Sequence, residues 1–285
     1  MLDLFRRKPD CPYHITPSGV LVNADCTAMN CGLPRLRSNI INLVLCDLPY
    51  GTTGLGWDSV IDTNFLWKHW KRILVENGAI ILFASQSFTT TLINSNPRWF
   101  KYEWIWVKNK ATGFVHAKNK PQKLHENILV FSSGTTIHKN QSPDRMTYNP
   151  QGLVKVNSVK YNCGHKVGGR QTTGLYWKFF KDIKKYKQEF TNYPKDVLYY
   201  NKDTKDVKHP TQKPISLCEY LIRTYSNPGE VILDNTCGYA TTGVASIRSG
   251  RRFICMEKES EWYEKSAKRL NKVSKKHKQK NWWRN

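Results

Sequence analysis

Short apolar segments alternate with amphipathic segments along most of the chain, which is the pattern of an α/β fold. Several apolar segments lack a polar face, so they are expected to lie buried between two layers of helices in a mostly parallel sheet. Each such segment is short enough for a strand and is followed by turn residues. The predicted strands cover residues 20–25, 40–47, 79–85, 102–108, 127–132, 231–234 and 253–257.

Four helices are predicted between these strands, because their apolar side chains recur at helical spacing. Glycine after the last periodic residue and proline near the first are typical of helix ends. The first helix would contain Leu66 and Trp70 and end near Gly78, the second would follow Pro214, the third would end at Gly250 and the fourth would begin at Ser260.

Residues 133–207 interrupt this alternation. They are rich in Asn, Gln, Gly, Thr, Tyr and Lys and contain few aliphatic runs. A long segment without helix or strand periodicity inside a compact fold is usually functional. We therefore predict an inserted region that faces the substrate, and not another packed strand–helix–strand unit.

The charge balance narrows the range of partners. The chain has 45 Lys and Arg against 22 Asp and Glu, and its isoelectric point is near 9.7. Such an excess attracts polyanions, of which nucleic acid is the usual one, although a merely soluble basic protein is the alternative. The chain from Lys265 onward holds nine Lys or Arg and no acid, and it is interpreted either as a solvated tail or as a DNA contact.

The eight cysteines indicate reduced thiols and not a disulfide framework. No CxxC pair occurs, and several cysteines lie inside apolar runs, as expected of a cytoplasmic protein. Cys163 and His165 could offer two metal ligands, but no second pair has matching spacing, so no metal site is predicted. No apolar run is long enough for a bilayer, so no membrane association is expected.

Acidic residues end three of the predicted strands, namely Asp47, Asp234 and Glu257. Ligands of an open α/β sheet bind outside the carboxyl ends of its strands. After Asp234 comes a glycine turn with Gly238, and Glu257 lies where dinucleotide folds place the acid that binds ribose hydroxyls. These features indicate a cofactor that carries a nucleoside. The chain lacks the GxGxxG and GxxxxGK[ST] motifs, which argues against a dinucleotide oxidoreductase and an NTPase.

The segment DLPYG at 47–51 combines an acid, a rigid turn and an aromatic ring. The exocyclic amine of adenine is a poor nucleophile, because its lone pair is delocalised into the ring. The carboxylate of Asp47 and a carbonyl of Leu48 or Pro49 could accept its two N–H bonds and free that lone pair, while Tyr50 stacks on the base. The alternative is an ordinary turn with a capping aspartate.

Three segments in this order, DLPYG at 47–51, HPTQKP at 209–214 and LDNTCGYATTG at 233–243, resemble the S-adenosylmethionine-dependent DNA amino-methyltransferases of bacteria and phages. Those enzymes methylate adenine N6 or cytosine N4, and the motif order is that of their β group. Segments 22–26, 104–114 and 125–134 resemble connecting segments of the family. The resemblance implies a Rossmann-like fold with an inserted target-recognition region.

The resemblance also implies roles for individual residues. Asp47, Pro49 and Tyr50 match the motif that holds the flipped base, and Asp47 also borders the cofactor. The remaining cofactor-binding residues would be Asp25, Cys26, His209, Thr211, Lys213, Asp234, Thr236, Cys237, Gly238 and Glu257. The chain departs from the family pattern at Leu48, where proline is usual, and at Thr236 and Tyr239, where phenylalanine and serine are usual.

By this resemblance the chain is divided into a catalytic part (1–132), a target-recognition insert (133–207), a cofactor-binding part (208–274) and a basic tail (275–285). DNA-contacting side chains in the insert are expected to include Arg145, Arg170 and Lys178.

The expected function is methyl transfer from S-adenosylmethionine to adenine N6 of a flipped base in double-stranded DNA, because Asp is typical of the adenine enzymes. The alternatives are a cytosine-N4 methyltransferase and a catalytically inert DNA-binding protein on the same fold. The expected location is the cytoplasm of a bacterial or phage-infected cell, in association with DNA. The sequence leaves open a homodimer and a cognate restriction nuclease as partners.

Overall fold

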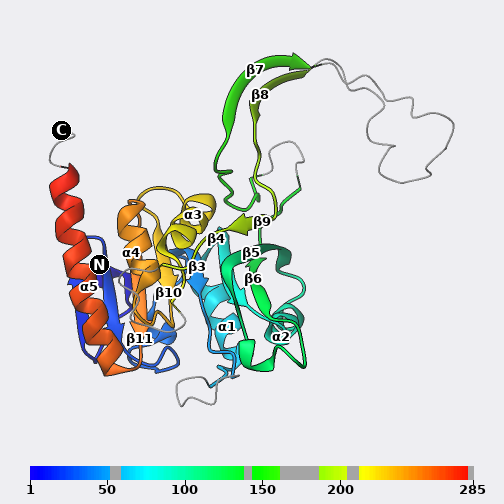
Figure 1. Ribbon diagram of the computed structural model, residues 1–285. Coiled ribbons are helices and arrows are strands. Elements are labelled where there is room, and N and C mark those ends of the chain that lie inside the picture. Colours follow the sequence, from blue (N-terminus) through cyan, green and yellow to red (C-terminus); the bar gives the residue numbers. More distant parts are fainter. Residues whose placement is uncertain (52–58, 138–142, 161–185, 204–211, 282–285) are drawn as a thin grey trace. The chain divides into compact units, whose positions relative to one another are not determined.

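The computed structural model describes residues 1–51, 59–137, 143–160, 186–203 and 212–281 (Figure 1). The chain divides into two compact units. The larger unit comprises Met1–Asn149 and Asp196–Asn285, and the smaller unit comprises Pro150–Lys195.

A single nine-stranded sheet forms the centre of the larger unit, in the order β1–β2–β11–β10–β3–β4–β6–β5–β9. Its strands are β1 (Tyr13–Thr16), β2 (Gly19–Asn23), β3 (Ile41–Cys46), β4 (Leu74–Ala84), β5 (Phe100–Thr112), β6 (Lys123–Phe131), β9 (Val197–Tyr199), β10 (Val231–Asp234) and β11 (Arg252–Glu257). All seven strands predicted from the apolar runs are present. The short edge strands β1 and β9 were not predicted, because few of their side chains are buried.

The central strands β2, β11, β10, β3 and β4 run parallel to their neighbours. Strand β6 is antiparallel to both β4 and β5, β1 is antiparallel to β2, and β9 is parallel to β5. The predicted mostly parallel sheet is therefore confirmed, with antiparallel strands toward its two edges.

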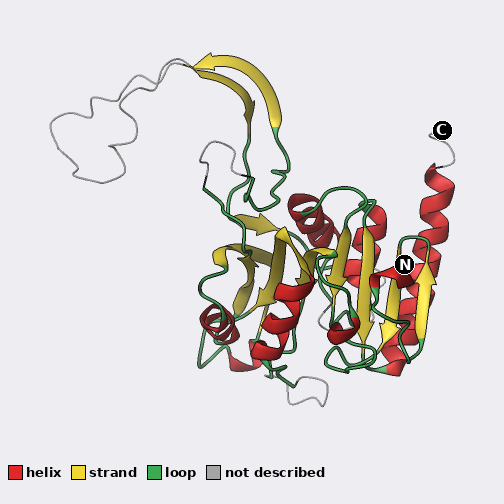
Figure 2. Cartoon of the chain, turned by 180° about the vertical axis from the view of Figure 1, so that it is seen from behind, coloured by secondary structure: helices red, strands yellow, loops and turns green. Residues whose placement is uncertain are grey.

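Helices cover both faces of the sheet, as the apolar strands require. Helices α3 (Ile215–Tyr225), α4 (Thr241–Arg248) and α5 (Ser260–Asn281) pack on one face (Figure 1). Helices α1 (Thr63–Ile73) and α2 (Phe88–Ser95) pack on the other (Figure 2). Alternate residues of one strand supply the two layers, so Val44 packs with α1 while Leu43 and Leu45 pack with α3.

Helix α1 ends earlier than its apolar spacing predicts. The expected end was Gly78, but the helix ends at Ile73 and β4 begins at Leu74. Leu74 pairs with Ile41 of β3, so sheet pairing replaces the next helical turn. Because Leu74 continues the helical spacing and also fits a strand, the apolar pattern alone did not separate the two elements.

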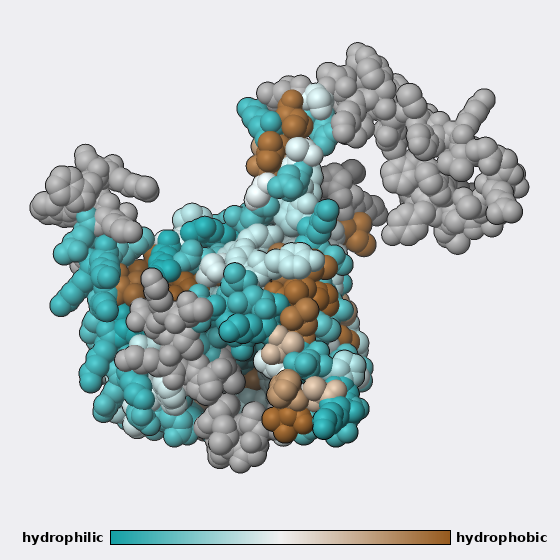
Figure 3. Space-filling model, viewed as in Figure 1, coloured by the Kyte–Doolittle hydropathy of each residue, from teal (hydrophilic) through white to brown (hydrophobic). Residues whose placement is uncertain are grey.

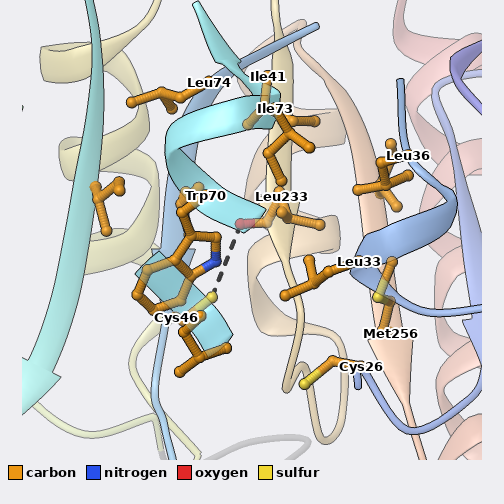
Figure 4. Close-up of a cluster of buried hydrophobic side chains, with 14 of the residues drawn as sticks. Cys26, Leu33, Leu36, Ile41, Cys46, Trp70, Ile73, Leu74, Leu233 and Met256 are labelled. Atoms are coloured by element: carbon orange, nitrogen blue, oxygen red, sulfur yellow. Dashed lines mark hydrogen bonds between the residues drawn. The ribbon is translucent and has the colours of Figure 1, made fainter. Parts of the chain in front are cut away.

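Buried hydrogen bonds fix the end of β3 against the end of β10. The thiol of Cys46 faces the carbonyl oxygen of Leu233 at 4.0 Å (Figure 4) and donates to Oδ1 of Asn235 at 3.2 Å. The indole Nε1 of Trp70, from α1, donates to the same Oδ1 at 3.1 Å. These contacts hold the residues that follow the two strands side by side.

Helix α5 carries the basic end of the chain. Leu270 is buried, and Tyr263 and Ala267 pack beside it, as their spacing predicts. The helix extends to Asn281, so the predicted basic tail (275–285) begins as helix, and residues 282–285 lie outside the described residues. The surface over α5 is hydrophilic (Figure 3). Among the described helices, none combines the length and apolar character that crossing a membrane requires.

The smaller unit contains an antiparallel pair of strands, β7 (Val154–Lys160) and β8 (Tyr186–Thr191). At its base the side-chain amide of Asn192 donates to the carbonyl oxygen of Gly152 at 2.7 Å. This unit covers a shorter segment of the chain than the predicted insert (133–207), since residues up to Asn149 and from Asp196 onward belong to the larger unit.

Candidate active site

Three acidic residues meet at one edge of the sheet. Asp47 follows β3, Asp234 ends β10 and Glu257 ends β11. These strands are parallel neighbours, so their carboxyl ends lie together. All three acids line a cavity of about 540 Å³. The cavity lies within the range usual for small-molecule sites.

The turn after β3 places an acid and an aromatic ring together. The phenol of Tyr50 donates to Oδ1 of Asp47 at 2.9 Å, and its ring stacks on Phe88 with the centroids 5.1 Å apart. The hydroxyl of Thr236 donates to the backbone carbonyl oxygen of Asp47 at 3.2 Å, which joins this turn to the loop after β10. Leu48 is buried, so the departure from proline adds a core contact.

Asp47 lies at one end of a series of side chains with alternating charges. Nζ of Lys213 lies 2.5 Å from Oδ2 of Asp47 and 3.4 Å from Oε2 of Glu126. Nζ of Lys108 lies 3.1 Å from Oε1 of Glu126. The side chains of Lys213 and Lys108 are only 10% and 2% exposed, so these pairs are shielded from water. We refer to Asp47, Lys213, Glu126 and Lys108 as the charge cluster.

Burial and charge act in opposite directions on the charge cluster. Burial raises the pKa of Asp47, although the ammonium of Lys213 opposes this. Burial disfavours the charged form of Lys213, but Asp47 and Glu126 outweigh it and raise the Lys213 pKa. For Glu126, the charges of Lys213 and Lys108 outweigh burial and lower the pKa. The ionised forms therefore stabilise one another.

The loop after β10 also lines the cavity. Glu257 accepts hydrogen bonds from the backbone N–H groups of Gly238 at 2.8 Å and Glu259 at 2.9 Å. Gly238 has a φ of +51°, a left-handed conformation that favours glycine. Burial raises the pKa of Glu257. The two N–H groups hold this carboxylate in position at the end of β11.

Asp234 is a buried acid of the cavity with a raised pKa. Burial raises its pKa to about 7, while hydrogen bonds from Thr242 and from the backbone N–H of Thr236 oppose the rise. Cys237, on the same loop, is buried, and burial raises its pKa well above the usual value. Near neutral pH Asp234 is therefore present in both its protonated and ionised forms.

The loop after β2 completes the cavity. Asp25 and Cys26 both line it. Oδ1 of Asp25 accepts hydrogen bonds from the backbone N–H of Thr27 at 2.8 Å and from its hydroxyl at 2.7 Å. Burial raises the pKa of Cys26 to about 12, so it is a neutral thiol.

Of the other predicted site residues, the structure describes only Arg145, which lies away from the cavity. Arg145 forms an isolated bridge with Thr135, and nearby Asn77 donates to the carbonyl oxygen of Pro143 at 2.9 Å. Asn77 lies near the start of β4, so Arg145 lies at the edge of the sheet opposite to Asp47. Outside the described residues lie His209, Thr211, Arg170 and Lys178.

The cavity also contains polar residues that the sequence did not point to, among them Lys108, Glu126, Gln212 and Asn235. Each lies within or next to a segment that resembles the family, at the end of an apolar run or within HPTQKP. For Lys108 the signal in the sequence is a polar residue that ends an apolar run, the same signal that points to Asp47, Asp234 and Glu257.

Buried amides in the cavity suit a polar ligand. Neither Nε2 nor Oε1 of Gln212, nor Nδ2 of Asn235, has a hydrogen-bond partner among the described residues. A buried polar atom without a partner costs about 1–3 kcal/mol, so a ligand that supplied partners would bind favourably. In the part of the chain that the structure describes, no group of three His, Cys, Asp or Glu side chains could hold a metal ion.

Comparison with known proteins identifies similar chains. A family model described as DNA methylase, for N6 and N4 methyltransferases, matches residues 41–269. The DNA adenine methyltransferase YhdJ of Escherichia coli (strain K12) is 46% identical over 259 residues, which cover 85% of this chain and 80% of that protein. The Type II methyltransferase M2.LlaDCHI of Lactococcus lactis subsp. cremoris is 45% identical over an alignment of 298 positions, which covers 92% of each chain.

A solved structure shares the fold. The crystal structure of the M1.HpyAVI–SAM complex matches with a TM-score of 0.55 at 19% identity, covering 88% of this chain and 98% of the other. The resemblance drawn from the three motifs is thus confirmed by the family model and by the relatives.

Proposed function

Because this chain belongs to the DNA methylase family of N6 and N4 methyltransferases, we propose that it methylates N6 of adenine in double-stranded DNA. The methyl donor is S-adenosylmethionine. The observation that carries the proposal is one cavity lined by Asp47, Tyr50 and Glu257. Adenine is favoured over cytosine because a relative of 46% identity is named a DNA adenine methyltransferase, and because the motif begins with Asp.

The residues of the cavity fit S-adenosylmethionine. Glu257 would accept hydrogen bonds from the ribose hydroxyls, and Asp25 would lie near the adenine ring. The unpaired amides of Gln212 and Asn235 would supply polar contacts. When bound, S-adenosylmethionine supplies a methyl group on a positively charged sulfur, which becomes a neutral thioether after the transfer.

Asp47 activates the target amine. A carboxylate oxygen can accept more than one hydrogen bond, so Asp47 can accept an N–H of adenine while it holds Tyr50 and Lys213. A backbone carbonyl of Leu48 or Pro49 would accept the second N–H. As the bond from N6 to the methyl carbon forms, N6 loses one proton. The carboxylate of Asp47 would take that proton.

Tyr50 provides the surface on which the flipped base stacks. Its ring is held by Phe88 and its hydroxyl by Asp47, so its position is fixed before DNA binds. Extruding a base from a duplex costs a few kcal/mol, which stacking on an aromatic ring partly offsets.

Nucleoside mass spectrometry tests the proposal. The purified protein is incubated with unmethylated DNA and S-adenosylmethionine, and the digested DNA should contain N6-methyladenine. Asp47→Ala should abolish the product while S-adenosylmethionine binding, measured by calorimetry, changes by less than about threefold. Asp10→Ala, which removes an exposed carboxylate, is the matched control. N4-methylcytosine as the only product would refute the adenine assignment, and activity of Asp47→Ala would refute the site.

The DNA-recognition region, the protein partners and the cellular location are also proposals. We propose that residues 133–207 read the DNA sequence, with Arg170 and Lys178 among the contacts. The name Type II methyltransferase, carried by the Lactococcus relative, motivates a search for a cognate restriction nuclease encoded nearby. Sedimentation distinguishes a monomer from a homodimer. The proposed location is the cytoplasm of a bacterial or phage-infected cell, where DNA is accessible.

A further inference from the structure

An exposed arm joins β5 to β6. Every residue from 109 to 125 is exposed, and we call this segment the β5–β6 arm. It carries Lys110, Lys118, Lys120 and Lys123 and no acidic residue. An arm of this composition attracts a polyanion.

The tip of the β5–β6 arm presents two large apolar side chains to solvent. Phe114 is 79% exposed and Val115 is 89% exposed. They lie on a single 3₁₀ turn, η3 (Phe114–His116). The turn follows Gly113, whose φ of +90° is a left-handed conformation that favours glycine. Adjacent exposed apolar side chains on a turn that buries none of its residues contribute little to the core, so a binding role is favoured.

Strand directions place the β5–β6 arm at the edge of the sheet that holds Asp47. Strand β4 is parallel to β3, β6 is antiparallel to β4, and β5 is antiparallel to β6. The turn from β5 to β6 therefore lies at the same edge as the carboxyl end of β3. Thr112 of the arm lines the cavity, as do Lys108 and Glu126 at its base.

Lys123 of the β5–β6 arm contacts the two residues that follow β4. Nζ of Lys123 lies 2.5 Å from Oγ of Ser85 and 3.4 Å from the carbonyl oxygen of Gln86. Both acceptors follow β4, at the same edge of the sheet. The apolar tip therefore lies at the same edge of the sheet as the cavity, two residues beyond Thr112, which lines it.

We propose that the β5–β6 arm inserts Phe114 and Val115 into the DNA stack at the position vacated by the flipped base. This inference rests on the proposed function. Apolar side chains that enter between base steps are a common device of proteins that distort DNA, and lysines beside them would neutralise the flanking phosphates. A second copy of this chain fits less well, because two arms without acidic residues would repel each other.

Duplexes with different costs of base extrusion test the proposal. The methylated site is first mapped on DNA treated with the wild-type protein. The variant F114A/V115A should then lose about tenfold or more in kcat/KM on the matched duplex. On a duplex whose target adenine faces an abasic position, it should lose less than about threefold, because little stacking remains to be broken. Ile15→Ala, on edge strand β1 and 46% exposed in the wild type, is the matched control.

Equal activity of wild type and variant on the matched duplex would overturn the inference. An equal loss on both substrates would also overturn it, as would conversion of a dimer to a monomer in sedimentation. A binding measurement keeps the inference independent of methylation. The wild type should prefer a duplex that lacks one central base, and F114A/V115A should lose this preference. If the wild type methylates no adenine but shows the preference, the proposed function fails while the insertion stands.

Discussion

The ammonium of Lys213 lies 2.5 Å from the carboxylate of Asp47, although 166 positions separate them in the chain. Lys213 lies just before α3, and Asp47 directly follows β3. Their contact links the acid that we propose to activate adenine to a segment on the cofactor-binding side of the chain. It also keeps a cation beside Asp47, where burial alone would favour the neutral carboxyl.

Lys213→Gln should shift the pH dependence of methylation. Without the ammonium, burial and Glu126 would raise the pKa of Asp47 further, and the ionised carboxylate is the form that would take the proton of the adenine amine. The acidic limb of kcat/KM should therefore move to higher pH by about one unit or more. Steady-state kinetics between pH 5 and 9 measure this shift.

Lys268→Gln is the control for this experiment, because Lys268 is an exposed residue of α5. An unchanged pH profile, combined with weaker S-adenosylmethionine binding, would contradict the role assigned to the Lys213–Asp47 contact. It would instead support the cofactor-binding role that the family resemblance implies for Lys213.

Glu257→Gln should weaken the binding of S-adenosylmethionine. A neutral amide accepts weaker hydrogen bonds than a carboxylate, and a charged hydrogen bond contributes about 1.5–3 kcal/mol, which corresponds to about a 10- to 100-fold increase in Kd. Calorimetry measures the change, with Glu264→Gln as an exposed control on α5. An unaltered Kd would place the ribose elsewhere. Burial raises the pKa of Glu257, so the affinity of the wild-type protein for S-adenosylmethionine should also fall as the pH is lowered through that pKa.

Asp234→Asn should change how stability depends on pH. The pKa of Asp234 is about 7 in the folded chain against an ordinary value of 3.8, so between these values the folded state binds more protons than the unfolded state. The free energy of unfolding of the wild type should therefore fall as the pH rises from about 4 to about 7, by at most about 4 kcal/mol.

The asparagine variant lacks this titration, so its stability should depend less on pH over that interval. It should also gain stability relative to the wild type at pH 8. Urea unfolding at pH 4.5, 6 and 8 measures both effects. Parallel pH dependences of the two proteins would show that the folded-state pKa of Asp234 is close to its ordinary value.

Much of the fold and part of the site followed from local sequence patterns. Apolar runs such as 40–47 form strands because a segment without a polar face must be buried on both sides. Asp47, Asp234 and Glu257 were placed together because parallel strands present their carboxyl ends at one edge. These inferences needed only the period of the pattern and the direction of the chain.

Other features depend on pairings that local patterns do not contain. Glu126 reaches Lys213 and Lys108 because β6 lies between β4 and β5, and that strand order cannot be obtained from the apolar runs. Arg145 was grouped with the insert by composition, whereas it bridges to Thr135 at the opposite edge from the cavity. In both cases sheet pairing decides the position.

Asn149 and Asp196, the residues that flank the smaller unit in the chain, are each hydrogen-bonded within the larger unit. The backbone N–H of Asn149 donates to the carbonyl oxygen of Thr224 at 2.7 Å, and the carbonyl oxygen of Asp196 accepts from Ile105 at 2.8 Å. The cost of closing a longer loop between fixed ends rises only slowly with its length. Evolution can therefore exchange, lengthen or shorten the segment between these anchors as a cassette, and an engineer can graft a foreign segment there, without rebuilding the catalytic scaffold.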